Sequence, residues 1–203
     1  MSVMRLLVLG AVRQHGRAHG YQVRNDLEFW GAHEWSTAKP GSIYHALKQL
    51  AKDGLLLPHE VAPSTAGGPP RVEYEVTEAG EEAFLALLRA GLRAHDERFD
   101  VLTSAVGFLV DLPRAEAIAL LRERVAALEA WAGEVRTHWT PDSPPAEFGH
   151  IGEIMRLWTH QAESDAGWTR GLIERLENGA YVMAGEGERE VTVLPEGMAN
   201  PYG

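Results

Sequence analysis

The stretch KPGSIYHALKQLAK, residues 39–52, gathers side chains whose types suit the binding of an anionic polymer. Its polar side carries Lys39, Ser42, Tyr44, His45, Lys48 and Lys52, which include all three lysines of the chain. Hydroxyl groups hydrogen-bond phosphate oxygens, while Lys and His side chains reach phosphates or the edges of bases. The alternative is an ordinary capped surface helix whose lysines are solvated.

A helix over this stretch would present these groups along one face. Pro40 suits its first turn, because the missing N–H of proline has no intrahelical partner there. Ile43, Leu47 and Leu50 recur at helical spacing and predict the side that is buried. Gly54 follows as a left-handed cap that ends the helix.

The neighbouring segments predict three helices followed by a hairpin and a further helix. Amphipathic patterns predict helices over 3–12 and 21–30, ahead of the helix already described. Two alternating strands, 55–63 and 71–77, flank a tip rich in Gly and Pro. Thr77 then caps a helix whose first turn is acidic, as the helix dipole favours. This order is that of a winged helix-turn-helix domain.

Three stretches of the sequence resemble the signatures of the PadR-type transcriptional regulators. They are HGYQV (19–23), KPGSIYHALKQLAKDGLL (39–56) and GGPPRVEYEVTEAGEEAF (67–84), in the order and spacing of that family. The resemblance implies a bacterial repressor that binds double-stranded operator DNA as a homodimer. It also implies that Tyr21 and Arg71 face the duplex, with Arg71 directed toward the minor groove.

The predicted fold is mainly α with a small β-hairpin wing. We expect a winged helix-turn-helix domain over 1–84, a helical dimerisation and effector domain over 85–179, and a tail over 180–203. In the tail, YVMA and VTVL predict a short hairpin around GEGERE.

The charge distribution favours DNA binding only weakly. Residues 1–72 hold eight basic and five acidic groups, a balance of +3, whereas the remainder holds 11 and 24, a balance of −13. The wing offers Arg71 alone beside Glu73 and Glu75, which predicts weak binding by each protomer. The competing hypothesis is a dimeric ligand-binding or interaction module whose winged helix has lost DNA binding.

The C-terminal half predicts long helices with an apolar seam. Residues 113–139 repeat apolar side chains at alternating spacings of three and four, as in a coiled coil. The dimerisation residues predicted from this seam are Ile118, Leu121, Val125, Leu128 and Val135. The alternative is a bundle that packs within its own chain.

Four of the six tryptophans lie in this half, and aromatic side chains can line pockets for flat organic ligands. A small aromatic effector is therefore a candidate ligand of Trp131, Trp139, Trp158 and Trp168. The alternative is that these side chains only form part of the hydrophobic core.

Composition and motifs exclude several other classes of protein. The chain has no cysteine, which excludes disulfides and thiolate chemistry, and no apolar run of roughly 18 residues. We interpret the apolar residues 1–12 as a core helix of a cytoplasmic protein without a membrane partner. Enzyme motifs are missing, and His15, His19 and His33 lack metal-ligand spacing, so neither an enzyme nor a cofactor is predicted.

Overall fold

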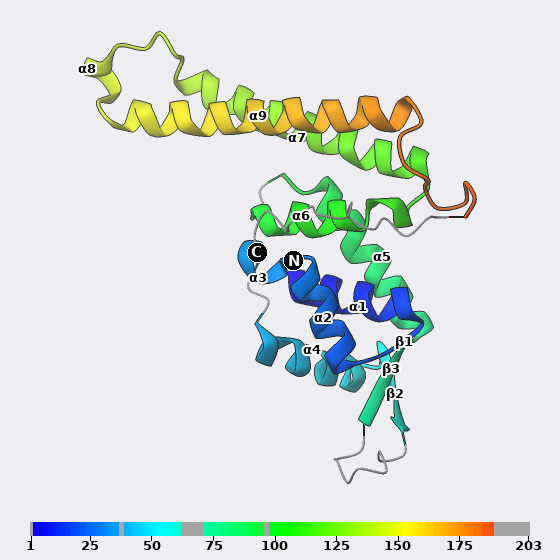
Figure 1. The fold of residues 1–203 in the computed structure, drawn as a ribbon. Helices are drawn as coiled ribbons and strands as arrows, with labels where there is room; N and C mark the ends of the chain where they lie inside the picture. The colour runs from blue at the N-terminus through cyan, green and yellow to red at the C-terminus, as the bar shows by residue number, and fades with distance from the viewer. Residues whose placement is uncertain (1, 37–38, 62–70, 96–97, 189–203) are drawn as a thin grey trace, which may run out of the picture. The chain divides into compact units, whose positions relative to one another are not determined.

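The structure, a computed structural model, describes residues 2–36, 39–61, 71–95 and 98–188. The described chain forms two compact units (Figure 1). The N-terminal unit comprises residues up to 91 together with 97–108, and the C-terminal unit comprises 92–96 and 109–189. Helix α5 (Glu78–Arg93) runs without interruption through residue 84, where the sequence predicts a domain boundary.

The N-terminal unit is built around helix α1 (Val3–His15). Every residue from Leu6 to Val12 is buried, because other elements of the unit cover α1 on several sides. These are the helices α2 (Gly20–Phe29), α4 (Pro40–Lys52) and α6 (Phe99–Gly107), and the strands β1 (Arg17–His19) and β3 (Arg71–Val76). Such all-round burial explains why the sequence of α1 is apolar on nearly every side.

The sheet of this unit has three antiparallel strands in the order β1-β3-β2, with β2 spanning Leu56–Val61. Strands β2 and β3 form the predicted wing, whose tip (62–70) lies outside the described residues. Strand β1 was not predicted. It pairs Arg17 with Glu75 and His19 with Glu73, and thereby ties the start of α2 to the wing.

The wing is attached to the end of α4 by a group of local contacts. Gly54 adopts a left-handed φ of 75°, as predicted. The Thr77 hydroxyl donates to the carbonyl of Gly54 (2.8 Å) and accepts the N–H of Gly80 (3.0 Å), which confirms Thr77 as the cap of α5. A Cβ on Gly80 would lie 2.1 Å from the carbonyl oxygen of Leu55, so only glycine permits this approach.

Short helical elements lie between the longer ones. A short helix, α3 (Ala32–Trp35), precedes α4. After α5 come α6 and a 3-10 turn, η1 (Leu109–Asp111).

The C-terminal unit is dominated by two long antiparallel helices that lie side by side (Figure 1). They are α7 (Arg114–His138) and α9 (Ile151–Glu177), connected through a short helical turn, α8 (Pro145–Phe148). Among the residues of the chain that are described, no helix is both long and apolar enough to cross a membrane.

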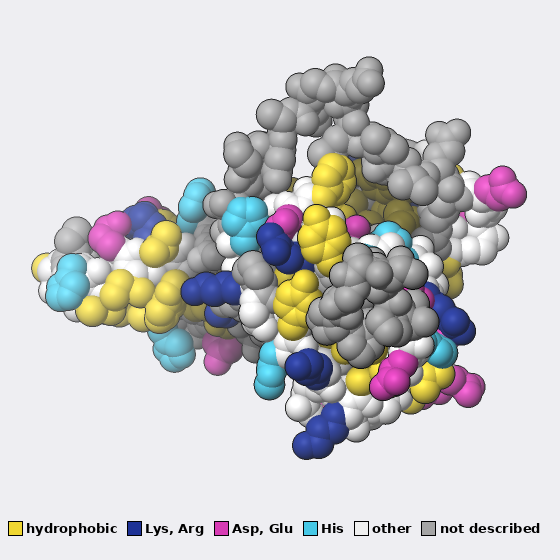
Figure 2. Space-filling model, turned by 60° about the horizontal axis from the view of Figure 1, so that its bottom comes forward, with side chains coloured by type: hydrophobic (Ala, Val, Ile, Leu, Met, Phe, Trp, Pro, Cys, Tyr) yellow, Lys and Arg dark blue, Asp and Glu magenta, His cyan; other side chains and the backbone are white. Residues whose placement is uncertain are grey.

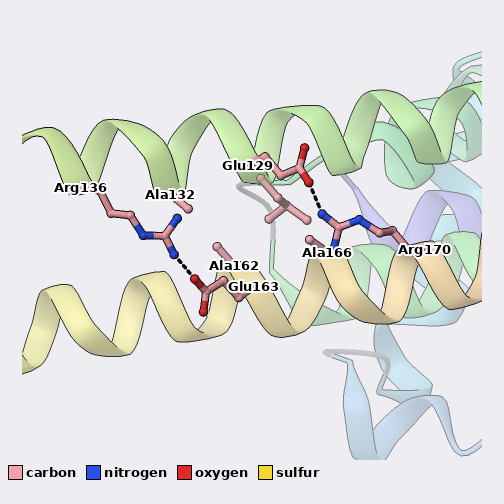
Figure 3. Close-up of a pocket in the computed structure, with 8 residues that line it drawn as sticks. Glu129, Ala132, Arg136, Ala162, Glu163, Ala166 and Arg170 are labelled. Carbon is pink, nitrogen blue, oxygen red and sulfur yellow. Dashed lines mark hydrogen bonds and ion pairs between the residues drawn. The ribbon is translucent and has the colours of Figure 1, made fainter. Parts of the chain in front are cut away.

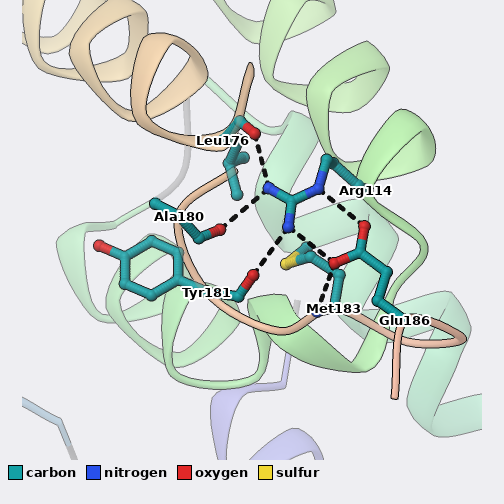
Figure 4. A network of polar contacts seen from close by, with 6 residues as sticks. All are labelled: Arg114, Leu176, Ala180, Tyr181, Met183 and Glu186. Carbon is teal, nitrogen blue, oxygen red and sulfur yellow. Dashed lines mark hydrogen bonds and ion pairs between the residues drawn. The ribbon is translucent and has the colours of Figure 1, made fainter. Parts of the chain in front are cut away.

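The segment after α9 is fixed to the start of α7 by Arg114 (Figure 4). The Arg114 guanidinium donates to three backbone carbonyls, those of Leu176, Ala180 and Tyr181. It also donates through two nitrogens to the Glu186 carboxylate, at 2.7 Å in each case. Of the predicted tail hairpin, Tyr181–Ala184 is not in a strand, and VTVL lies outside the described residues.

Candidate nucleic-acid interface

The N-terminal end of α4 is closed by Lys39 and Ser42. The Ser42 hydroxyl accepts the backbone N–H of Lys39 (2.9 Å) and donates to its carbonyl (2.7 Å), while Pro40 is the first helical residue, as predicted. The Lys39 residue is exposed. The hydroxyl of Ser42 therefore already has partners within the turn, and any phosphate contact would compete with them.

The remainder of α4 has an apolar side and a polar side, as predicted. Ile43, Leu47 and Leu50 are at most 2% exposed and fix the helix to the core. Exposed side chains of α4 include Tyr44, His45, Lys48 and Lys52. The structure thus brings the predicted donors and cations of α4 to one exposed side of the helix, which we call the α4 polar face.

Helices α2 and α4 meet at Gly20. A Cβ on this residue would lie 2.5 Å from Cε1 of Tyr44 and 3.3 Å from Cδ1 of Leu47, so the Tyr44 ring lies directly over the glycine. His19 caps α2 by accepting the N–H of Gln22 at Nδ1 (3.1 Å). Tyr21, the next residue after Gly20, is 59% exposed. The His-Gly-Tyr signature therefore combines a cap, a close helix contact and an exposed tyrosine.

Two histidines of this unit, His15 and His19, have hydrogen-bond partners within the protein. His15 Nε2 lies 2.7 Å from Oδ2 of Asp26, and His19 is engaged in capping. Within the described ranges, no three His, Asp or Glu side chains are grouped so as to hold a metal ion.

One glutamate of the wing, Glu75, is paired with neighbouring basic side chains. Glu75 Oε2 lies 2.7 Å from His59 Nε2 and accepts a hydrogen bond from Arg17 Nε (3.0 Å). The hydrogen bond with His59, and the smaller influence of Arg17, lower the pKa of Glu75. Arg71 is the first residue of β3, but its side chain is not among those described.

One basic residue of α2 was not predicted as a site residue. Arg24 lies on α2 one turn after Tyr21 and pairs with Glu28. Its spacing of three from Tyr21 was a signal that could have identified it. The face in Figure 2 shows Lys and Arg side chains standing among hydrophobic and His side chains rather than in one continuous basic patch.

The comparison with protein families agrees with this geometry. Residues 8–86, which contain the wing and α4, match the model of the Transcriptional regulator PadR-like family. We call residues 8–86 the PadR-like domain. The match agrees with the resemblance to PadR-type transcriptional regulators that the sequence predicts.

Solved structures of PadR proteins are distant relatives. Bacillus subtilis PadR in complex with operator DNA is 20% identical, with 86% of this chain and 99% of that chain covered and a TM-score of 0.41. The same protein in complex with p-coumaric acid is also 20% identical (87% and 99% covered, TM-score 0.34). The PadR-like regulator BC1756 from Bacillus cereus is 19% identical (86% and 98%, TM-score 0.36). No curated protein matches the chain.

Outside the PadR-like domain, part of the predicted dimerisation seam is used within the chain. Leu121 and Leu128 are buried, and Leu128 belongs to a cluster with Ala132, Ala162 and Ala166 between α7 and α9. The other predicted seam residues, Ile118, Val125 and Val135, are half-buried. The seam therefore packs in part on α9 of its own chain.

The four tryptophans differ in their surroundings. Trp131 and Trp158 contact each other with ring centroids 6.2 Å apart. Trp139 is buried beneath the Arg156 guanidinium, which lies 5.3 Å from its ring. Trp168 is 44% exposed.

A small groove between α7 and α9, of about 130 Å³, contains none of these tryptophans (Figure 3). Its floor is formed by Leu128 and three alanines, and its rims by the ion pairs Arg136–Glu163 and Glu129–Arg170. Since both pairs are internally neutralised, the groove offers a ligand no unpaired charge.

Proposed function

We propose that this chain is a cytoplasmic bacterial repressor that binds a palindromic operator as a homodimer. The proposal is supported above all by the α4 polar face, in which Tyr44, His45 and Lys48 project from a helix whose opposite side is fixed in the core. In helix-turn-helix proteins such a helix enters the major groove, and dimers bind half-sites about one helical turn apart.

The proposed roles follow from side-chain chemistry. Lys48 and His45 contact base edges or phosphates in the major groove, and Tyr44 donates to a phosphate. Lys39 and Lys52, at the two ends of α4, contact flanking phosphates. Tyr21 and Arg71 are proposed contacts from α2 and from the wing, and Ser42 mainly shapes the helix end that faces the DNA.

The proposed dimer contact uses exposed apolar residues of α9. Ile151, Ile154, Leu157 and Trp158 lie within two turns of this helix and are all at least 39% exposed; we call them the α9 apolar surface. Leu121 and Leu128 are buried within the chain, so they are not proposed as direct dimer contacts. A second copy would cover the α9 apolar surface by isologous contact.

The proposed effector is a small aromatic molecule that binds near Trp131 and Trp158. Their contact supplies aromatic surface that a flat ligand could extend. Release from the operator would follow if the effector binds the arrangement unable to bind DNA more tightly than the other.

The deciding experiment substitutes Lys48 with alanine. We expect Lys48→Ala to weaken binding about tenfold for operator and scrambled duplexes alike, and to reduce the slope of log K against log salt by about 1, because one phosphate contact is lost. Fluorescence anisotropy across a salt series measures both quantities, with duplexes obtained from a random-sequence selection.

Arg122→Ala is the matched control, because Arg122 is an exposed cation on α7, outside the PadR-like domain. It should leave DNA affinity unchanged. A wild-type protein that selects no sequence would instead favour the interaction module, an alternative supported by the acidic balance and the glutamates of the wing.

A further inference from the structure

Arg24 and Glu28 form an ion pair on the exposed side of α2. Arg24 Nε donates to Oε1 of Glu28 at 2.7 Å, and the two side chains are 39% and 44% exposed. Neither residue supports the core, which α2 reaches through Gly20, Val23 and Leu27. The pair is therefore not required for packing.

The position of the pair connects it to the α4 polar face. Tyr21 precedes Arg24 by three residues and so lies next to it on α2. Tyr44 of α4 covers Gly20, the first residue of the same helix. The pKa of the Arg24 guanidinium is raised, chiefly by the hydrogen bond with Glu28, and slightly by Tyr44 and Tyr21. The guanidinium thus lies close to two proposed DNA contacts.

The order of the two residues does not favour helix stability. In helices, an acidic residue four positions before a basic one is the better arrangement, whereas here Arg24 precedes Glu28. Glu28 also lies in the last turn of α2, near the negative end of the helix dipole. Because the pair is also exposed to solvent and salt, another anion can replace the carboxylate easily.

We propose that Arg24 is an additional phosphate contact, and that Glu28 occupies its guanidinium until DNA binds. The first helix of a helix-turn-helix unit crosses the DNA backbone, so α2 would carry Arg24 to a phosphate as α4 enters the groove. A phosphate accepts two parallel hydrogen bonds from a guanidinium, as a carboxylate does. Binding then exchanges Glu28 for the phosphate, and Glu28 acts as a built-in competitor that weakens DNA binding.

The inference rests on the proposed function and is tested with a double-mutant cycle. Wild type, E28Q, R24Q and R24Q/E28Q are titrated with the same selected duplex across salt. E28Q should bind about threefold tighter, as expected for loss of a competing exposed ion pair. R24Q should bind about tenfold more weakly. The salt slope for R24Q should be smaller by about 0.9. In the R24Q background, E28Q should have no effect.

E177Q serves as the matched control, since Glu177 pairs with Arg122 between α7 and α9 and its loss removes the same charge. It should change neither affinity nor slope. An E28Q gain that persists without Arg24 would mean general repulsion and overturn the proposal, as would an unchanged slope for R24Q. Failure of wild type itself to select DNA would instead reject the proposed function. Thermal unfolding of each variant confirms that it is folded.

Discussion

At the scale of single residues, a glycine shapes the α4 polar face as much as the cations do. The Tyr44 ring can lie over α2 only because Gly20 has no side chain. This contact fixes the orientation of a tyrosine that we propose to face a phosphate. It also limits how far α2 and α4 lie apart, and hence the position of Arg24 relative to α4.

Substitution of Gly20 with alanine should therefore disturb both stability and DNA binding. The new Cβ would lie 2.5 Å from the Tyr44 ring, so the ring or the helix must move. We expect a loss of about 1–2 kcal/mol in the free energy of unfolding, typical of overpacking. DNA affinity should fall as well, because Tyr44 is displaced. Chemical denaturation and anisotropy measure the two effects.

Gly41→Ala is the matched control for the effect of Gly20→Ala on stability. It lies in α4, and a Cβ on this residue would meet no heavy atom within 4 Å. Gly41→Ala should therefore keep or raise stability, because alanine favours helices. If Gly20→Ala were as stable as Gly41→Ala, the close contact between Gly20 and Tyr44 would not constrain the fold.

Single residues that act locally were predictable from the sequence. Pro40, Gly54 and Thr77 follow rules that involve only a few neighbouring residues, and each lies where its chemistry required. Arg24 was missed because its proposed role depends on Tyr44, which packs on the start of α2 from another helix. Such a relation is absent from the local pattern of α2.

At the scale of elements, the sequence patterns predicted elements with local signals and missed those that depend on pairing with distant segments. The three-residue strand β1 carries no strand pattern of its own and exists through its pairing with β3. The apolar seam of α7 predicted a dimer contact, with packing inside the chain as the alternative. Its spacing could not distinguish a partner in the same chain from one in a second copy, and α9 covers part of it.

The two long helices also share a short motif. Both α7 and α9 contain Glu-x-x-Ala-Gly-x-x-Arg, at residues 129–136 and 163–170. Because the helices are antiparallel, the glutamate of each motif pairs with the arginine of the other motif. These two ion pairs border the groove (Figure 3). Two equivalent helical segments therefore face each other across a floor of alanines.

The attachment of α9 to α7 through Arg114 should depend on pH. Hydrogen bonds from Arg114, and one from the N–H of Met183, lower the pKa of Glu186 from 4.5 to about 2 (Figure 4). A carboxyl group with a lowered pKa stabilises the fold above its ordinary pKa, and this contribution is lost as the pH falls from about 4.5 to about 2. Wild type should therefore exceed Glu186→Gln in unfolding free energy at pH 6, but not at pH 2.

Urea denaturation at a series of pH values gives this difference directly. The glutamine variant is a close control, because it keeps the size of the side chain and an acceptor for Met183. A difference between the two proteins that stayed constant from pH 6 to pH 2 would show that the charge of Glu186 does not contribute to the attachment.

At the scale of the whole molecule, residues 1–72 carry a charge balance of +3 and residues 73–203 one of −13. The negative charge of the second part does not assist the proposed DNA binding, so contacts in the N-terminal unit would supply the affinity. A dimer doubles those contacts on one operator. The charge distribution and the exposed apolar residues of α9 therefore both favour the proposed dimer.

A charge placed within the α9 apolar surface should separate the two copies. Leu157 is 61% exposed, so Leu157→Glu is solvated in the monomer and should leave its fold intact. In a dimer the same carboxylate would be buried without a partner. We expect the dissociation constant of the dimer to rise by roughly 30-fold or more, the effect of losing a central contact residue. Analytical ultracentrifugation over a concentration series measures it.

Ala126→Glu adds the same charge to an exposed position on α7, outside the α9 apolar surface, and should leave the dimer intact. DNA binding by the Leu157→Glu protein then distinguishes the effect of dimerisation from that of the DNA contacts. The Leu157→Glu protein keeps the whole α4 polar face, so it should bind an isolated half-site as wild type does while losing the added affinity for a full palindrome. If it remained dimeric, or if wild type bound half-site and palindrome equally, the α9 apolar surface would have another partner and each PadR-like domain would act alone.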